Sequence, residues 1–128
     1  MIYLLDTHVL IWFLTGDKKL KPRHREILSN QNHRFLVSTI VLAELKYLDA
    51  AKRIPLNFGL VLKLLTKSKN CVILPVDQEV IAQMPLGLNI HDALIVGSGI
   101  AYHHATKNDL QVVTEDHEII RSKLIPVA

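Results

Sequence analysis

Four acidic residues lie beside or within apolar segments, or at the start of helix-like segments, where a carboxylate is either buried or has a specific role. Asp6 directly follows the apolar run Ile2–Leu5, and Glu44 lies in an otherwise apolar stretch. Asp92 and Asp116 each stand near the start of a further helix-like segment. An unpaired buried carboxylate is costly, and two carboxylates about 4 Å apart repel by several kcal/mol at an effective dielectric near 20. Acids gathered at one place therefore predict a bound cation or raised pKa values.

Such a cluster would support one kind of chemistry. Oxygen ligands without a thiolate favour Mg²⁺ or Mn²⁺ over zinc, and a hard ion of this type keeps coordination positions free for a phosphate. The metal lowers the pKa of a bound water, orients that water and neutralises charge on the phosphate. The four acids together would thus suit hydrolysis of a phosphodiester.

Each acid also has a simpler explanation. Asp6 and Asp116 could each cap the helix that follows, by accepting backbone N–H bonds. Glu44 could lie at a helix edge beside Lys46 or pair with Arg53. Whether the acids share a site depends on the elements that carry them.

Short apolar segments rich in β-branched residues predict the strands, since near-continuous apolar runs are typical of strands buried on both faces. These segments are Ile2–Leu5, Arg34–Ser38, Cys71–Leu74 and Gln111–Thr114, with Leu124–Val127 as a candidate edge strand. Alternation of strands with helices favours a parallel sheet between helical layers. Right-handed crossovers bring the carboxyl ends of all strands to one side, where ligands of such sheets bind.

Helical spacing and capping residues mark the segments between the strands. The expected helices are Val9–Leu14 closed by Gly16, Arg23–Ser29 after Pro22, Thr39–Leu48 with Ser38 or Thr39 as N-cap, Leu56–Lys67 after Pro55, a short helix from Asp77 through Ala82 and Met84, Asn89–Thr106, and Asp116–Ser122. Asn89 as N-cap with Asp92 three residues later would form a variant capping box, which explains Asp92 without chemistry. Gly97 and Gly99 cost about 1 kcal/mol each against Ala and would let another backbone pack close.

Composition limits the class of protein. A chain of 128 residues with 49% hydrophobic and 21% charged residues suits one domain, residues 1–128. The apolar start has no basic region before it, so it does not resemble a signal peptide, and the charge-free run Ala93–Thr106 is shorter than the ~20 residues of a membrane span. The lone Cys71 has no intrachain disulfide partner and is expected in the core. We therefore expect a cytoplasmic protein.

The net charge of +3 arises partly from two groups of basic residues. They are Lys18, Lys19, Lys21, Arg23 and Arg25, and Lys63, Lys67 and Lys69. Basic surface attracts polyanions such as nucleic acid, although so modest a group is often only a solvated face. Beside an acidic pocket it would suit an enzyme that holds phosphates with Lys and Arg and keeps its carboxylates for metal.

Taken together, four motifs resemble those of the PIN-domain ribonucleases, most closely the small toxins of VapBC toxin–antitoxin pairs. The motifs are Leu5-Asp6-Thr7, Ala43-Glu44-Leu45, His91-Asp92-Ala93-Leu94-Ile95 and Thr114-Glu115-Asp116. They occur in the right order, and the likeness covers essentially the whole chain. The fold that this resemblance implies is an α/β, PIN-like three-layer α/β/α sandwich with a central, mainly parallel sheet of four to five strands.

The resemblance also implies roles for these residues. In the family, the matching acids hold Mg²⁺ or Mn²⁺ and activate water to cut RNA, leaving a 5′-phosphate and a 3′-hydroxyl; here they are Asp6, Glu44, Asp92 and Asp116. The hydroxyls matching Thr7 and Thr114 support the site, and we place Ser38 with them. Glu115 could share a role with Asp116.

Partners follow from the same resemblance. It implies a homodimer and a cognate antitoxin that wraps the early helices and blocks the acidic pocket, with Trp12 as a candidate anchor. The function expected from the sequence is a metal-dependent endoribonuclease toxin of a type II pair. A catalytically silent RNA- or protein-binding module, or a housekeeping nuclease without an antitoxin, stays open.

Other phosphate-handling classes fit less well. His91-Asp92 with His24 and Asp116 superficially matches HD-type phosphohydrolases, but those are all-helical. A phosphoacceptor receiver needs paired acids at its first strand, and a haloacid-dehalogenase-type phosphatase needs Asp-x-Asp where this chain has Asp6-Thr7-His8. His8, His91 and His117 flank the acids as ligands, proton carriers or surface residues.

Overall fold

The computed structural model describes residues 1–128 and contains one parallel sheet of four strands. The strands are β1 (Ile2–Leu5), β2 (Arg34–Ser38), β3 (Cys71–Leu74) and β4 (Gln111–Val113), arranged in the order β3-β2-β1-β4. Tyr3 of β1 pairs with Phe35 on one side and Gln111 on the other. The predicted parallel sheet is confirmed, and β4 ends one residue before Thr114.

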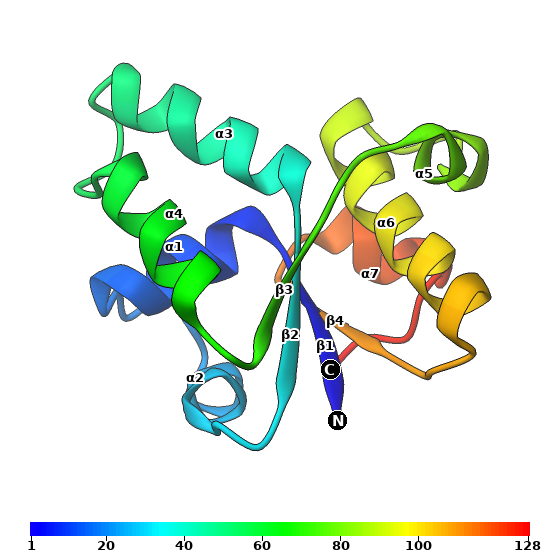
Figure 1. Cartoon of the computed structure of the whole chain (residues 1–128), viewed down its shortest axis with the longest axis horizontal. Coiled ribbons are helices and arrows are strands. Elements are labelled where there is room, and N and C mark those ends of the chain that lie inside the picture. Colours follow the sequence, from blue (N-terminus) through cyan, green and yellow to red (C-terminus); the bar gives the residue numbers. More distant parts are fainter.

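Helices cover both faces of this sheet, which gives the three-layer sandwich that the sequence predicted (Figure 1). In Figure 1, the first four helices lie on the left of the sheet and the last three on the right. They are α1 (Thr7–Thr15), α2 (Pro22–Ser29), α3 (Thr39–Ala50), α4 (Phe58–Lys67), α5 (Gln78–Gln83), α6 (Ile90–Thr106) and α7 (His117–Ser122). None of them is long and apolar enough to cross a membrane.

Several expected helix boundaries differ from the structure by one or two residues; α1, for example, begins at Thr7 rather than Val9, and α3 ends at Ala50 rather than Leu48. Helix α4 begins at Phe58 rather than Leu56, because Asn57 accepts a bond from the N–H of Leu60 and so caps the helix there. The segment Leu124–Val127 forms no strand, only an isolated parallel bridge to β4. Pro126 lies inside that segment and has no N–H to donate, which limits the ladder.

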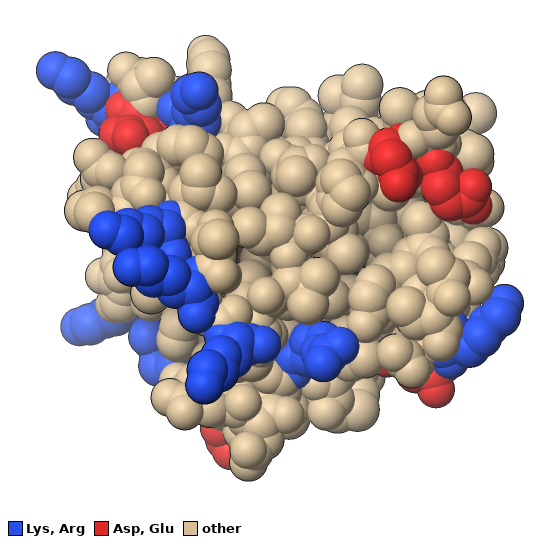
Figure 2. Space-filling model, viewed as in Figure 1, with Lys and Arg blue, Asp and Glu red and all other residues tan.

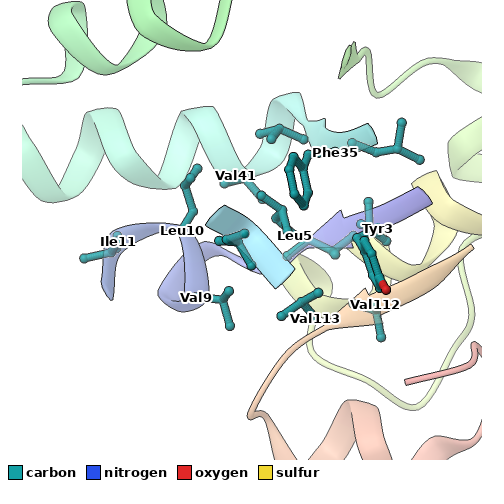
Figure 3. Close-up of a cluster of buried hydrophobic side chains, with 14 of the residues drawn as sticks. Tyr3, Leu5, Val9, Leu10, Ile11, Phe35, Val41, Val112 and Val113 are labelled. Carbon is teal, nitrogen blue, oxygen red and sulfur yellow. The ribbon is translucent and has the colours of Figure 1, made fainter. Parts of the chain in front are cut away.

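The core lies on both faces of the strands, and Figure 3 shows part of it. Leu4, Leu36 and Val112 on three neighbouring strands are fully buried, and each such side chain stabilises the fold by roughly 1.5–3 kcal/mol. Cys71 on β3 is half-buried and packs against the core rather than lying within it. Burial raises the pKa of its thiol to about 11, so this cysteine stays protonated.

Helix α6 is continuous through Gly97 and Gly99, and Gly97 is where another backbone comes close. A Cβ atom on Gly97 would lie 2.9 Å from the Cα atom of Met84 and 3.0 Å from the carbonyl oxygen of Val80. The absence of a side chain therefore lets α5 and the turn after it pack directly on α6. This contact fixes the segment that leads into the first turn of α6.

Candidate active site

Asp6 occupies the junction between β1 and α1 and is only 5% exposed. It stands at the N-cap position of α1, yet its side chain makes no bond that caps the helix. Instead, the hydroxyl of Thr114 donates a 2.6 Å hydrogen bond to its Oδ2. The helix-cap explanation of Asp6 is therefore wrong.

Burial is the main influence on the charge of Asp6. It raises the pKa of this carboxyl above its ordinary value of 3.8 and outweighs the opposing effects of the Thr114 hydrogen bond and of nearby His8. The negative charge of Asp116 raises the pKa further. The ionised form of Asp6 is therefore disfavoured in the folded protein, and a bound cation would stabilise it.

Glu44 projects from α3 toward the same place and is half-buried. Its Oε1 accepts a 2.9 Å hydrogen bond from the hydroxyl of buried Thr7, and its Oε2 lies 4.0 Å from Nδ1 of His91. Neither Lys46 nor Arg53 forms an ion pair with it. The helix-edge explanation of Glu44 is therefore wrong as well.

Asp92 lies on the first turn of α6 and is 8% exposed. Asn89 caps the helix by accepting the N–H of Asp92 at 2.9 Å, and its side-chain amide donates a 2.6 Å bond to Oδ2 of Asp92. The capping box is thus half formed, because the carboxylate binds a side chain instead of a backbone N–H. Burial first, and the charge of Asp116 second, raise the pKa of Asp92.

Asp116 stands between β4 and α7, and it does cap its helix. Its Oδ1 accepts the N–H groups of Glu118 at 2.8 Å and Ile119 at 3.1 Å, which confirms the capping explanation for this acid. The hydroxyl oxygen of Thr114 accepts the N–H of Asp116 at 3.0 Å. Thr114 therefore joins two acids, since the same hydroxyl donates to Asp6.

Glu115 points away from this place. Its carboxylate lies 3.9 Å from Nζ of Lys21 and 4.0 Å from Nδ1 of His24, a buried residue of α2. It therefore does not share the position of Asp116. His24 forms no ion pair or hydrogen bond with Asp92 or Asp116, the acids of an HD-type site; its ring contacts Glu115 and the carbonyl oxygen of Ala128 instead.

One hollow of about 270 Å³ brings the four acids together. It is lined by Asp6, His8, Glu44, Asn89, Ile90, His91, Asp92 and Asp116. Thr7 and Thr114 are buried behind two of the acids and hold them. Ser38 does not line the hollow: it caps α3 and accepts a 3.0 Å bond from Ser98. His117 is exposed outside the hollow.

The donor chemistry of this hollow fits a hard divalent cation. All four acids offer oxygen ligands, and the raised pKa values of Asp6 and Asp92 mark negative charges held close together in a poorly solvated place. In the present side-chain arrangement no three acidic, His or Cys side chains converge on one point that could hold a metal ion. Thr114, Thr7 and Asn89 each hold one of these carboxylates by a hydrogen bond, to Asp6, Glu44 and Asp92 respectively.

Three contacts of acidic residues were not predicted from the sequence. The spacing of Asn89 and Asp92 indicates a cap but not the direct bond between their side chains. The double role of Thr114 depends on the pairing of β1 with β4, which no local pattern reveals. The contact of His24 with Glu115 crosses from α2 to the turn after β4, and the charged sequence neighbours of His24, Arg23 and Arg25, give no hint of its burial.

Two solved structures have a similar fold. One is VapBC2 from Rickettsia felis bound to a DNA fragment from its promoter, with a TM-score of 0.67 and 20% identity over 100% of this chain and 98% of the other. The second is DNA-bound VapBC from Salmonella typhimurium, with a TM-score of 0.62 and 20% identity over 100% and 97%.

Comparison with curated proteins gave no match. The family model of the PIN domain matches residues 3–123, which is nearly the whole chain and includes all four acids. This protein belongs to the PIN-domain family.

Proposed function

We propose that this protein is a metal-dependent endoribonuclease that hydrolyses RNA phosphodiesters at the acidic hollow. The observation that carries the proposal is Asp6, a buried carboxyl with a raised pKa and no capping bond, which lines one hollow with three further acids. Membership of the PIN-domain family supports the same activity.

Asp6, Glu44, Asp92 and Asp116 are the residues that would hold the ion. Bound Mg²⁺ or Mn²⁺ would supply charge neutralisation and the activation of a water for attack on phosphorus. Thr114 and Thr7 orient the carboxylates of Asp6 and Glu44, as outer partners of metal ligands commonly do.

We further propose that the protein is the toxin of a type II toxin–antitoxin pair, working in the cytoplasm. The likeness of fold to two VapBC complexes supports this role. In this proposal a cognate antitoxin binds the chain and blocks the acidic hollow, and the protein forms a homodimer.

The test is cleavage of end-labelled RNA, single-stranded and structured, by wild type and by Asp6→Asn, with Mg²⁺, with Mn²⁺ and with EDTA. The substitution removes one charge with little change of volume. Asp109→Asn is the matched control, because Asp109 has a 97% exposed side chain and lies outside the hollow. We expect cleavage by wild type and Asp109→Asn only when metal is present.

Equal cleavage by wild type and Asp6→Asn would contradict the proposed site. Metal binding without cleavage of any RNA would favour a silent binding module. Co-expression with the neighbouring reading frame tests the toxin role, since growth arrest relieved by that frame is expected of a toxin.

A further inference from the structure

A second hollow, of about 460 Å³, adjoins the acidic one, and we call it the Trp12 hollow. It is lined by His8, Ile11, Trp12, Thr15, Asp17, Lys19, Leu48, Arg53, Ile54 and Pro55. His8 lines both hollows, so the two are neighbours on the surface with this side chain between them. An RNA strand with one phosphate at the acids would need to pass only this side chain to reach the Trp12 hollow.

Two aromatic rings form one wall of this hollow. His8 and Trp12 lie one turn apart on α1, and their ring centroids are 5.9 Å apart at an angle of 48°. His8 is exposed and Trp12 half-buried, so ring surface remains open to the hollow. Exposed aromatic surface on which bases stack is the usual means of holding unpaired nucleotides.

Two cations from different elements complete the hollow. Lys19 follows α1 and Arg53 follows α3, and both are exposed. The backbone holds each in place: the N–H of Arg53 donates to Leu48 at 2.9 Å, and the N–H of Lys19 donates to Oδ1 of Asp17 at 2.9 Å. Because Asp17 already accepts this bond, its carboxylate is partly occupied.

Charge alone would not single out this place. Figure 2 shows many basic side chains over α4 and α2. Lys63 and Lys67 of α4 are exposed, but no residue of α2 or α4 lines the acidic hollow. A third hollow shares Glu44 and His91 with the acidic hollow, and exposed Tyr47 lies in its lining. It has no Lys or Arg that could bind a phosphate. The Trp12 hollow has both aromatic surface and cations, and it shares His8 with the acidic hollow.

We propose that the Trp12 hollow binds the nucleotide of single-stranded RNA that flanks the cleaved phosphate. The base stacks against Trp12 and His8, and the phosphate binds Lys19 and Arg53. The inference rests on the proposed function, whose substrate it narrows to unpaired RNA. A base in a duplex keeps its face covered by its neighbours and cannot stack on Trp12.

Trp12 itself supplies the assay, because it is the only tryptophan of the chain. A short single-stranded RNA is titrated into wild type in EDTA, where metal-dependent cleavage does not occur. We expect saturable quenching of tryptophan fluorescence by the single strand and little quenching by a duplex of the same sequence.

Variants that replace each cation by an uncharged glutamine test the roles of Lys19 and Arg53. Lys19→Gln and Arg53→Gln should weaken RNA binding and lower the slope of log K against log salt by about 0.7 for each lost phosphate contact. Lys63→Gln is the matched control, since it removes the same charge from α4 outside the hollow. It should leave the quenching unchanged, and circular dichroism of each variant confirms that it is folded.

Unchanged fluorescence, with Lys19→Gln and Arg53→Gln binding RNA like Lys63→Gln, would overturn the inference and leave a protein segment as the better occupant. The outcome is separable from that of the proposed function. Cleavage without quenching would refute the Trp12 hollow alone. Quenching that both cation variants abolish, without cleavage under any metal, would refute the nuclease and leave the RNA site standing.

Discussion

The junctions β1–α1 and β4–α7 lie side by side in the sheet and have the same local plan, a buried strand followed by an acid at a helix N-cap position. At β4–α7, Asp116 accepts two N–H groups of the helix. At β1–α1, Asp6 accepts none that caps the helix, although it is the more buried acid.

The difference shows that an acid at a strand end indicates a functional site only when it is known not to cap the helix that follows. Asp116 is explained by the stability of α7, whatever else it does. Asp6 lowers the free energy of unfolding of the isolated protein, since burial disfavours its charged form more than the hydrogen bonds from Thr114 and the Thr7 backbone favour it. An acid that destabilises the folded protein and does not cap its own helix is the stronger candidate for a catalytic role.

The largest expected effect is on cleavage. Asp6→Asn should lower the single-turnover rate by at least about 10²-fold, because it removes a charged ligand of the proposed metal, and loss of an outer partner alone commonly costs about 10- to 100-fold. Asp116→Asn should cost about 10- to 100-fold, the range for weakened support of a metal site. Asparagine still caps a helix, so any loss in Asp116→Asn reports charge alone. Equal losses would erase the distinction between the junctions.

The next largest expected effect is the loss of metal affinity when Thr114 is replaced. Thr114 contacts an acid at each of the two junctions. Thr114→Val removes both the donor to Asp6 and the acceptor for the N–H of Asp116. We expect Mn²⁺ affinity, measured by calorimetry, to fall about 10- to 100-fold. Thr66→Val is the control, since its hydroxyl bonds only a carbonyl within α4. Equal affinity in the two variants would show that Thr114 is a structural residue only.

Stability should respond in opposite directions at the two junctions. Asp116→Ala loses a helix cap and should lower the free energy of unfolding by about 1 kcal/mol. Asp6→Asn should raise it at pH 7 without metal, because a costly buried charge is removed. Urea unfolding in EDTA measures both. A destabilised Asp6→Asn would mean that its carboxylate is structurally satisfied.

The smallest effect is on the pH dependence of stability. Because the pKa of Asp6 is raised in the folded state, the folded protein binds more protons than the unfolded one just above pH 3.8. Its contribution to stability is therefore present below that pH and is lost as pH rises through the folded pKa. Unfolding curves of wild type minus those of Asp6→Asn should show this decline, and an increase with pH instead would reverse the sign assigned to Asp6.

The sequence predicted the strands well because their apolar runs are nearly continuous and have clear ends. Arg34–Ser38 and Cys71–Leu74 are right to the residue. The start of α4 was missed because Leu56 continues the apolar spacing but packs on the core outside the helix. Pattern alone does not distinguish these two ways of burying a leucine.

For the site, the sequence predicted which acids approach one another but not what holds them. That Asp6, Glu44 and Asp116 line one hollow follows from parallel strands ending at one edge. That Asp116 caps and Asp6 does not depends on the direction of each side chain at its junction, and so does the turn of Glu115 toward Lys21. Such directions are set by contacts between distant segments.

The hydrogen bond from Thr114 to Asp6 joins residues 108 positions apart. During synthesis β1 emerges before the other three strands, and β4, which pairs with its edge, emerges after them. A growing chain that has not yet produced β4 therefore has Asp6 without its hydroxyl partner and without Asp116. The proposed site is incomplete until all four strands have been made, so the unfinished polypeptide lacks part of the machinery that the proposed activity needs.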